Sequence, residues 1–198
     1  MKVLLVEDHP TMRLGLRAAV ELREGTEVAG EAAAAEEALE LARTLTPDLV
    51  VLDLRLRGEP DGIELCREIK SLPDPPQVVI YTAYNSPQAI SSCLLSGADS
   101  YVHKGEEPRK LLNAIEDTNA GERVWLLGGE EEEASTDLRS AAAASSLTDR
   151  EQEVLYLVLK RRTNARIAGE LHITVPTVKT HVSNILRKLD ARNREDLF

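Results

Sequence analysis

The sequence predicts a two-part protein, in which an α/β domain built on a parallel sheet precedes a small all-α domain. Three observations support this fold class. Short apolar segments alternate with amphipathic segments five times in residues 1–120, and the pattern from Leu147 onward is purely helical. The two regions also differ in charge. Residues 147–198 carry ten Lys or Arg and seven Asp or Glu, whereas residues 1–146 carry 14 and 27, so a mildly basic module follows a strongly acidic one.

The α/β region contains five predicted strands and five predicted helices. The strands are expected at Lys2–Val6, Thr26–Glu31, Leu49–Leu52, Gln77–Tyr81 and Ser100–His103. The helices are expected at about Thr11–Leu22, Glu36–Leu45, Gly62–Ser71, Pro87–Ser96 and Pro108–Ala120. The third strand is apolar throughout, which is typical of a strand covered on both faces. This alternation predicts a five-stranded parallel sheet of the flavodoxin-like type, with strand order 2-1-3-4-5.

Polar residues follow four of these strands at the edge where the carboxyl ends of parallel strands meet. Glu7 and Asp8 follow the first strand, and Asp53 follows the third. Thr82 follows the fourth strand and Lys104 the fifth. Since strands 1 and 3 are predicted neighbours, three carboxylates share a pocket, and their repulsion favours a bound hard cation such as Mg²⁺. Each residue alone could be a turn residue or a solvated charge, but together they indicate a functional site.

The composition is that of a globular protein, with 42% apolar residues. There is no apolar run of about 18 residues and no signal-peptide pattern at the N-terminus, so a cytoplasmic protein without a membrane partner is expected. Cys66 and Cys93 have no metal-ligand neighbours, and free, partly buried thiols are expected. Residues 122–146 include a Gly-rich acidic run and predict a linker, with Trp125 as a packing anchor at its start.

The C-terminal region contains three predicted helices. Thr148 and Glu151 form a capping box that opens the first helix. The second runs from about Asn164 to Leu171, and the third begins after the N-cap Thr174. A short helix, a tight turn and a longer helix are typical of a helix-turn-helix module, whose second helix enters the major groove of DNA.

The third of these helices has an apolar face and a polar face. The residues predicted to face the core are Val178, Val182, Ile185 and Leu189. The opposite side carries an outer stripe of four residues: Lys179, Thr180, Ser183 and Arg187. Composition alone does not decide between a DNA-reading surface and the solvated face of a small protein-interaction module.

Residues 1–121, with their strand-end polar groups, resemble the receiver domain of bacterial two-component response regulators. The resemblance implies that Asp53 accepts a phosphoryl group from a histidine kinase. It implies a Mg²⁺ site whose ligands are Glu7, Asp8, Asp53 and the main-chain carbonyl of Arg55. It also implies that Thr82 and Lys104 bind phosphoryl oxygens and that Tyr101 is a switch residue. The physics agrees, because a metal and a lysine neutralise charge on a transferring phosphoryl group.

The C-terminal region is similar to the LuxR-type helix-turn-helix domain, and the two matches together resemble the NarL/FixJ class of response regulators. The second resemblance rests on Leu147-Thr148-x-Arg150-Glu151-x-Glu153-Val154-Leu155, Ile167-Ala168 and Thr177-Val178-Lys179-x-His181-Val182-x-x-Ile185-x-x-Lys188-Leu189. It implies a DNA-binding domain over residues 147–198, which reads bases and phosphates through the outer stripe. Contacts to the DNA backbone are expected from His181 and Lys188, and Thr174 and Thr177 are placed at the same surface.

The charges of the two domains and the switch expected in the first one also lead to expectations about partners. We expect phosphorylation to pair two receivers through the helices at Pro87–Ser96 and Pro108–Ala120, and the homodimer to bind two DNA half-sites about one helical turn apart. Before phosphorylation, the acidic domain is expected to lie against the basic face of the DNA-binding domain.

Two other functions are compatible with parts of the sequence. An aspartyl-phosphate phosphohydrolase would use the same carboxylates and Mg²⁺, but dehalogenase-type enzymes resemble Asp-x-Asp at the nucleophile, and here Arg55 stands in the second Asp position. The receiver could also act on a DNA-binding protein as an interaction switch that works without phosphorylation. The complete set of strand-end residues favours the phosphorylated regulator over both.

Overall fold

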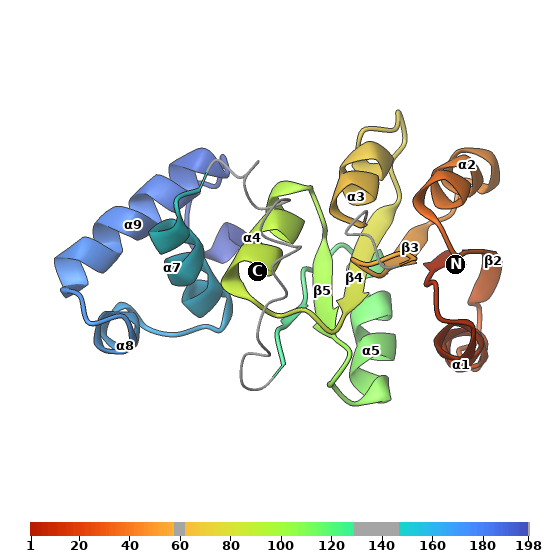
Figure 1. Ribbon diagram of the computed structural model, residues 1–198, viewed down its shortest axis with the longest axis horizontal. Coiled ribbons are helices and arrows are strands. Elements are labelled where there is room, and N and C mark those ends of the chain that lie inside the picture. The colour runs from red at the N-terminus through yellow and green to blue at the C-terminus, as the bar shows by residue number, and fades with distance from the viewer. Residues whose placement is uncertain (58–61, 129–146, 198) are drawn as a thin grey trace.

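A six-stranded parallel sheet forms the centre of the α/β domain (Figure 1). The computed structural model describes residues 1–57, 62–128 and 147–197. The strands are β1 (Lys2–Val6), β2 (Glu27–Ala32), β3 (Leu49–Leu52), β4 (Gln77–Thr82), β5 (Ser100–His103) and β6 (Trp125–Leu126). Their order is β2-β1-β3-β4-β5-β6, which confirms the predicted fold class and the predicted order of the first five strands.

The sixth strand was not predicted, because it lies inside the segment expected to be a linker. Strand β6 has two residues and pairs in parallel with β5, so that Trp125 lies beside Tyr101 and Leu126 beside Val102. Two residues are too short a segment to show the alternation by which a strand is recognised in a sequence. Trp125 therefore packs on the receiver part of the chain, as expected, and it does so as a residue of the edge strand β6.

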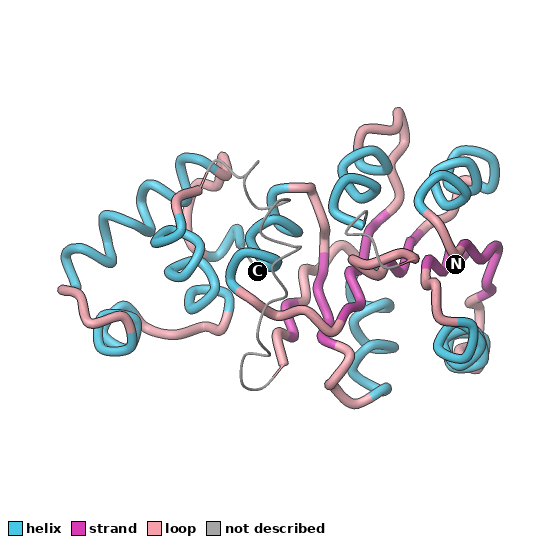
Figure 2. Tube along the Cα trace, in the orientation of Figure 1, coloured by secondary structure: helices cyan, strands magenta, loops and turns pink. Residues whose placement is uncertain are grey.

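Helices cover both faces of the sheet (Figure 2). One face packs against α1 (Pro10–Glu21) and α5 (Pro108–Asn119), and the other against α2 (Ala35–Leu45), α3 (Gly62–Lys70) and α4 (Pro87–Leu95). Within β1, Val3 and Leu5 belong to the first apolar core, and Leu4 and Val6 to the second. Successive residues of a strand point to opposite faces, so an all-apolar strand fills both cores at once.

The C-terminal domain consists of α7 (Asp149–Leu159), α8 (Asn164–Glu170), α9 (Val175–Lys188) and the short 3-10 helix η1 (Glu195–Leu197). Thr148 and Glu151 form the predicted capping box at the start of α7. Thr174 Oγ1 accepts a hydrogen bond from the N–H of Thr177, which caps α9 as predicted. No helix in the described part of the chain has both the length and the hydrophobicity needed to cross a membrane.

The two domains share one apolar core, because α7 packs directly on α4. The buried side chains Ile90 and Cys93 of α4 belong to the same cluster as Leu155 and Val158 of α7. In Figure 1, α4 lies between the sheet and the C-terminal helices. The face of α4 on which we expected two receivers to pair is therefore occupied by α7 in this structure.

Candidate functional site

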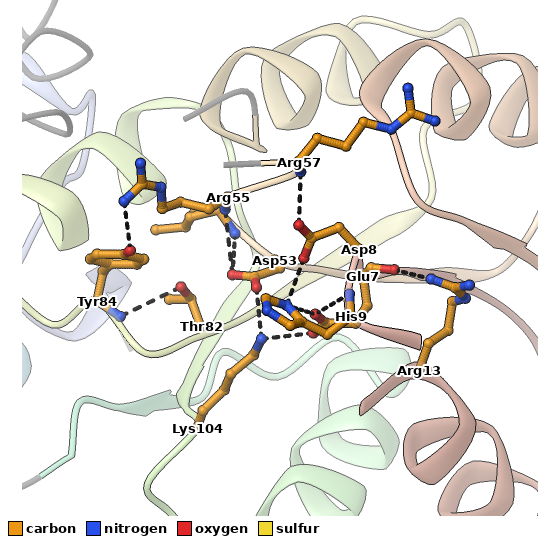
Figure 3. A network of polar contacts seen from close by, with 11 residues as sticks. Glu7, Asp8, His9, Arg13, Asp53, Arg55, Arg57, Thr82, Tyr84 and Lys104 are labelled. Carbon is orange, nitrogen blue, oxygen red and sulfur yellow. Dashed lines mark hydrogen bonds and ion pairs between the residues drawn. The ribbon is translucent and has the colours of Figure 1, made fainter. Parts of the chain in front are cut away.

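The strand-end residues come together at one edge of the sheet because the main-chain ladder continues past the strands. The N–H of Asp53 donates to the carbonyl oxygen of Val6 at 3.0 Å, and the N–H of Lys104 donates to that of Thr82 at 2.7 Å. Glu7, Asp53 and Thr82 are all nearly inaccessible to solvent. Figure 3 shows Glu7, Asp8, Asp53, Thr82 and Lys104 gathered in one pocket, as the strand order predicted.

Lys104 places its ammonium between two carboxylates of this pocket. Its Nζ lies 2.6 Å from Asp53 Oδ2 and 2.7 Å from Glu7 Oε2, and its side chain is 15% exposed. Burial by itself lowers the pKa of Lys104, but the attraction and hydrogen bonds of Asp53 and Glu7 outweigh it, so the pKa is raised above its usual value. The ammonium therefore stays charged and holds the two carboxylates together from β1 and β3.

A candidate metal site lies beside the ammonium. Glu7, Asp8 and His9 each place one ligand atom within 4.8 Å of the others. Asp8 Oδ1 is buried, and no donor in the described part of the chain reaches it with hydrogen-bond geometry, although His9 Nδ1 lies 2.8 Å away. Asp8 Oδ2 accepts a hydrogen bond of 2.8 Å from the N–H of Arg57. A buried carboxylate oxygen without a donor fits a cation ligand, so the acidic residues suit Mg²⁺.

Tyr101 is buried and held on three sides. Its hydroxyl donates to the main-chain oxygen of Tyr84, and its main-chain N–H donates to the carbonyl oxygen of Val124 at 2.7 Å. Its ring stacks on Trp125 with a centroid distance of 6.3 Å and an interplanar angle of 11°. Any rotation of Tyr101 must therefore disturb both the loop after Thr82 and strand β6.

The outer stripe of α9 faces solvent. All four of its residues are exposed: Lys179, Thr180, Ser183 and Arg187. Thr174 is also exposed, whereas Thr177 and His181 are half-buried. Because α4 contacts α7 and leaves the stripe open, the expectation that the acidic domain covers the basic face is wrong for this structure. The apolar sides of the two domains meet, and apolar burial contributes more to such a contact than weakly attracting solvated charges.

Lys188 has a different environment from the rest of the predicted DNA surface. Its Nζ lies 2.6 Å from Glu151 Oε2, and the Glu151 side chain is 5% exposed. This ion pair joins the end of α9 to the start of α7. The ammonium of Lys188 therefore stabilises the domain itself, which the helical spacing did not reveal.

Comparison with known proteins agrees with this geometry. The family model of the response regulator receiver domain matches residues 3–116, and that of the bacterial regulatory proteins of the luxR family matches residues 145–198. This chain belongs to the LuxR-type response regulators. It is 39% identical over 201 aligned positions to the response regulator protein VraR of Staphylococcus epidermidis, covering 98% of this chain and 92% of VraR.

Solved structures of other response regulators share the fold of this regulator. A LuxR-family two-component response regulator from Aurantimonas is 37% identical, with a TM-score of 0.59 over 72% of this chain and 94% of that one. RcsB from Salmonella enterica serovar Typhimurium, solved bound to a promoter, is 24% identical, with a TM-score of 0.58 over 100% of this chain and 95% of that one. The likeness to RcsB shows a common fold. Receiver domains of this family generally bind Mg²⁺ at the acidic pocket.

Three residues of the site were not predicted from the sequence of the regulator. His9 contacts both Glu7 and Asp8, and its position directly after two predicted Mg²⁺ ligands was a usable signal. Arg13 donates from Nη1 to the main-chain oxygen of Glu7 at 2.5 Å and fixes the end of β1. The Tyr84 hydroxyl accepts a hydrogen bond from the side chain of Arg55, and no local sequence pattern predicts that contact.

Proposed function

We propose that this response regulator is switched by phosphorylation of Asp53 by a histidine kinase. The single observation that carries the proposal is the pair of short contacts from Lys104 Nζ to Asp53 and Glu7. A buried carboxylate beside a fixed ammonium can attack a phosphorus atom while the ammonium neutralises charge on the phosphoryl oxygens. Thr82, fully buried at the end of β4, can donate its hydroxyl to one of those oxygens.

The ligands proposed for Mg²⁺ are Glu7, Asp8, Asp53 and the main-chain carbonyl of Arg55. When bound, Mg²⁺ would neutralise charge on the transferring phosphoryl group. The chain itself orients these ligands: Arg13 fixes the carbonyl of Glu7, and the N–H of Arg57 holds Asp8. The N–H of Leu54 donates to Asp53 Oδ1 at 2.6 Å, which leaves Oδ2 toward Lys104.

We infer that the signal reaches the DNA-binding domain through the contact between α4 and α7. A phosphoryl group on Asp53 draws the Thr82 hydroxyl toward itself, and the loop after Thr82 carries the carbonyl that Tyr101 binds. That loop leads directly into α4, which supports α7. A shift of this loop therefore changes the α4–α7 contact between the two domains, and with it the pairing of receivers.

The DNA surface proposed is the outer stripe of α9, with additional contacts from Thr174, Thr177 and His181. The exposure of the four stripe residues supports this assignment. Lys188 stays a proposed contact to the DNA backbone only if its ammonium leaves Glu151.

We propose domains at residues 1–121 and 147–198, joined by the segment 122–146, whose first part contains β6. A homodimer on paired half-sites is proposed, working in the bacterial cytoplasm where the chromosome is.

The phosphorylation proposal is tested by intact-mass measurement after incubation with acetyl phosphate and Mg²⁺. The wild type should gain one phosphoryl group that alkaline hydroxylamine removes, and Asp53→Asn should gain none. Asp74→Asn, in an exposed loop, is the matched control and should behave as the wild type does. An adduct that persists in Asp53→Asn, or that forms equally well in the presence of a chelator, contradicts the proposal.

The DNA proposal is tested by measuring binding at several salt concentrations. The double substitution Lys179→Ala and Arg187→Ala should weaken binding and reduce the salt dependence by about one unit for each lost phosphate contact. Lys110→Ala, at an exposed position of α5, controls for the loss of positive charge. Normal binding by the double variant would show that DNA uses another surface.

A further inference from the structure

The side chain of His103 connects two loops that begin beside the acidic pocket. His103 is the last residue of β5 and lies opposite Thr82 in the register of β4 and β5. Its ring nitrogen Nε2 lies 2.9 Å from the main-chain oxygen of Ala83, and Nδ1 lies 3.1 Å from the main-chain nitrogen of Gly105. The ring therefore joins the loop after β4 to the loop after β5.

These two contacts assign the proton of the neutral ring. A carbonyl oxygen only accepts hydrogen bonds and a main-chain N–H only donates them, so Nε2 carries the proton and Nδ1 accepts. Both ring nitrogens are then used by the main chain, and neither is left to bind a phosphoryl oxygen. Any effect of His103 on the acidic pocket must therefore pass through the two loops that it joins.

Packing holds the His103 ring in this orientation. The residue is only 9% exposed. A Cβ at Gly105 would lie 2.8 Å from Nδ1, and a Cβ at Gly128 would lie 2.7 Å from the same atom, so the main chain approaches the ring at two places where only glycine fits. An imidazole enclosed in this way by main chain keeps the orientation in which both of its hydrogen bonds form.

The two loops carry the groups that are proposed to bind the phosphoryl oxygens. Lys104 stands between His103 and Gly105, and its main-chain N–H donates to the carbonyl oxygen of Thr82 at 2.7 Å. Its ammonium lies 2.6 Å from Asp53 Oδ2. Figure 3 shows Lys104 and Thr82 near Asp53 in the pocket. Because Lys104 lies just beyond the end of β5, the hydrogen bond from Gly105 to the ring limits the movement of its main chain.

We propose that His103 is a positioning residue for phosphoryl transfer to Asp53. It keeps Lys104 and Thr82 aligned, because it holds the residue that follows each of them. The inference rests on the proposed phosphorylation of Asp53. With acetyl phosphate, a carboxylate oxygen of Asp53 bonds to phosphorus, the bond from phosphorus to the acetyl oxygen breaks, and acetate leaves with the electron pair. The ammonium and the hydroxyl must face the phosphoryl oxygens in that transition state, and a displacement of about 1 Å can slow such a reaction about a hundredfold.

Two substitutions separate positioning from simple packing. His103→Asn keeps one of the two contacts, because an Asn side-chain oxygen accepts a hydrogen bond from the N–H two residues later, here that of Gly105. His103→Leu keeps more of the side-chain volume but makes neither hydrogen bond. If the ring only fills space, the Asn variant should be the more impaired, since it leaves the larger cavity. If the ring positions Lys104, the Leu variant should be the more impaired.

The experiment uses the full chain with acetyl phosphate and Mg²⁺, and follows the phosphorylated fraction by intact mass. The rate constant should fall about tenfold in His103→Leu and about threefold in His103→Asn, as expected when two hydrogen bonds or one are lost. Gly105→Ala, which places a methyl group against Nδ1, should slow the wild type and add little to His103→Leu, because both changes release the same contact. Nitrogen NMR of the wild-type imidazole should show the proton on Nε2.

His172→Asn is the matched control, since His172 is an exposed histidine with a φ of 52°, a conformation that Asn tolerates. It should be phosphorylated at the wild-type rate. The proposal is overturned if His103→Leu reacts as fast as the wild type, or if His103→Asn reacts more slowly than His103→Leu, while the wild type is phosphorylated at Asp53. Should Asp53→Asn still acquire the phosphoryl group, the proposed function fails first, and the two failures are distinguishable.

Discussion

Replacing Glu151 by Gln should destabilise the DNA-binding domain through the loss of a single charge. The Glu151 carboxylate accepts hydrogen bonds from the N–H of Thr148 at 2.7 Å and from its hydroxyl at 3.0 Å. Lys188 Nζ donates to the same oxygen at 2.6 Å. Since Gln also serves in a capping box, Glu151→Gln keeps the cap to α7 and removes only the charge that faces Lys188.

The size of the effect follows from burial. Breaking a fully buried ion pair is destabilising by about 3–5 kcal/mol, and breaking an exposed one by about 0.2–1 kcal/mol. Glu151 is 5% exposed but Lys188 is 24% exposed, so the ammonium can be partly hydrated once its partner is neutral. We expect a decrease in the free energy of unfolding of about 1–2 kcal/mol, between those limits. Lys188→Met should cost a similar amount, and the two changes should not add.

The effect should depend on pH. Burial by itself raises the pKa of Glu151, but the hydrogen bonds from Lys188 and Thr148 outweigh it and lower the pKa in the folded state. The stabilisation is therefore present above the unfolded-state pKa of about 4.3 and is lost as the pH falls through the folded-state value. The difference between wild type and Glu151→Gln should be complete at about pH 7 and should shrink as the pH is lowered below about 4.

The assay is urea unfolding of the full chain, followed by far-UV circular dichroism at several pH values. Glu153→Gln, on the same helix, breaks a half-buried pair with Arg150, whose side chain is 35% exposed, and should change stability by less than about 1 kcal/mol. A Glu151→Gln effect no larger than that control, or one that persists unchanged at low pH, would refute the reasoning. The same variants also test the role of Lys188 in DNA binding. If Lys188 only stabilises the domain, Lys188→Met should lower the stability of the protein without changing the salt dependence of DNA binding.

Further predictions concern Gly62 beside Asp53, the thiols and the sixth strand. A Cβ at Gly62 would lie 2.3 Å from the main-chain oxygen of Asp53, so Gly62→Ala should cost about 1–3 kcal/mol in urea unfolding and slow the proposed phosphorylation, unlike the open position Gly15→Ala. Cys66 and Cys93 are free and buried, and burial raises the pKa of Cys66 to about 11, so a thiol reagent should modify neither in the native protein and both in urea. Trp125 is the sole tryptophan and stacks on Tyr101, so its emission should change on phosphorylation, and an unchanged spectrum would show that the stack is not disturbed.

Local patterns in the sequence were sufficient for the first five strands, for the α-helices and for the strand-end residues of the acidic pocket. The apolar run Leu49–Leu52 predicted a doubly covered strand, and all four residues are buried. The capping box at Thr148 and the prolines that begin α4 and α5 are local signals, and each lies where predicted. Because parallel strands end at one edge, the order of strands also predicted that Asp53 and Lys104 would meet.

Only the tertiary structure decided how these elements use their remaining surfaces. Helical periodicity showed that α7 has an apolar face but could not show that α4 shares it, so the docking of the two domains was missed. Spacing placed Lys188 near the DNA surface, while its partner Glu151 is 37 residues away in the chain. The pairs of Tyr101 with Trp125 and of Arg55 with Tyr84 likewise join separate segments. Periodicity specifies which side of an element is buried, whereas the partner of each side chain depends on distances between segments, which are set only when the chain is folded.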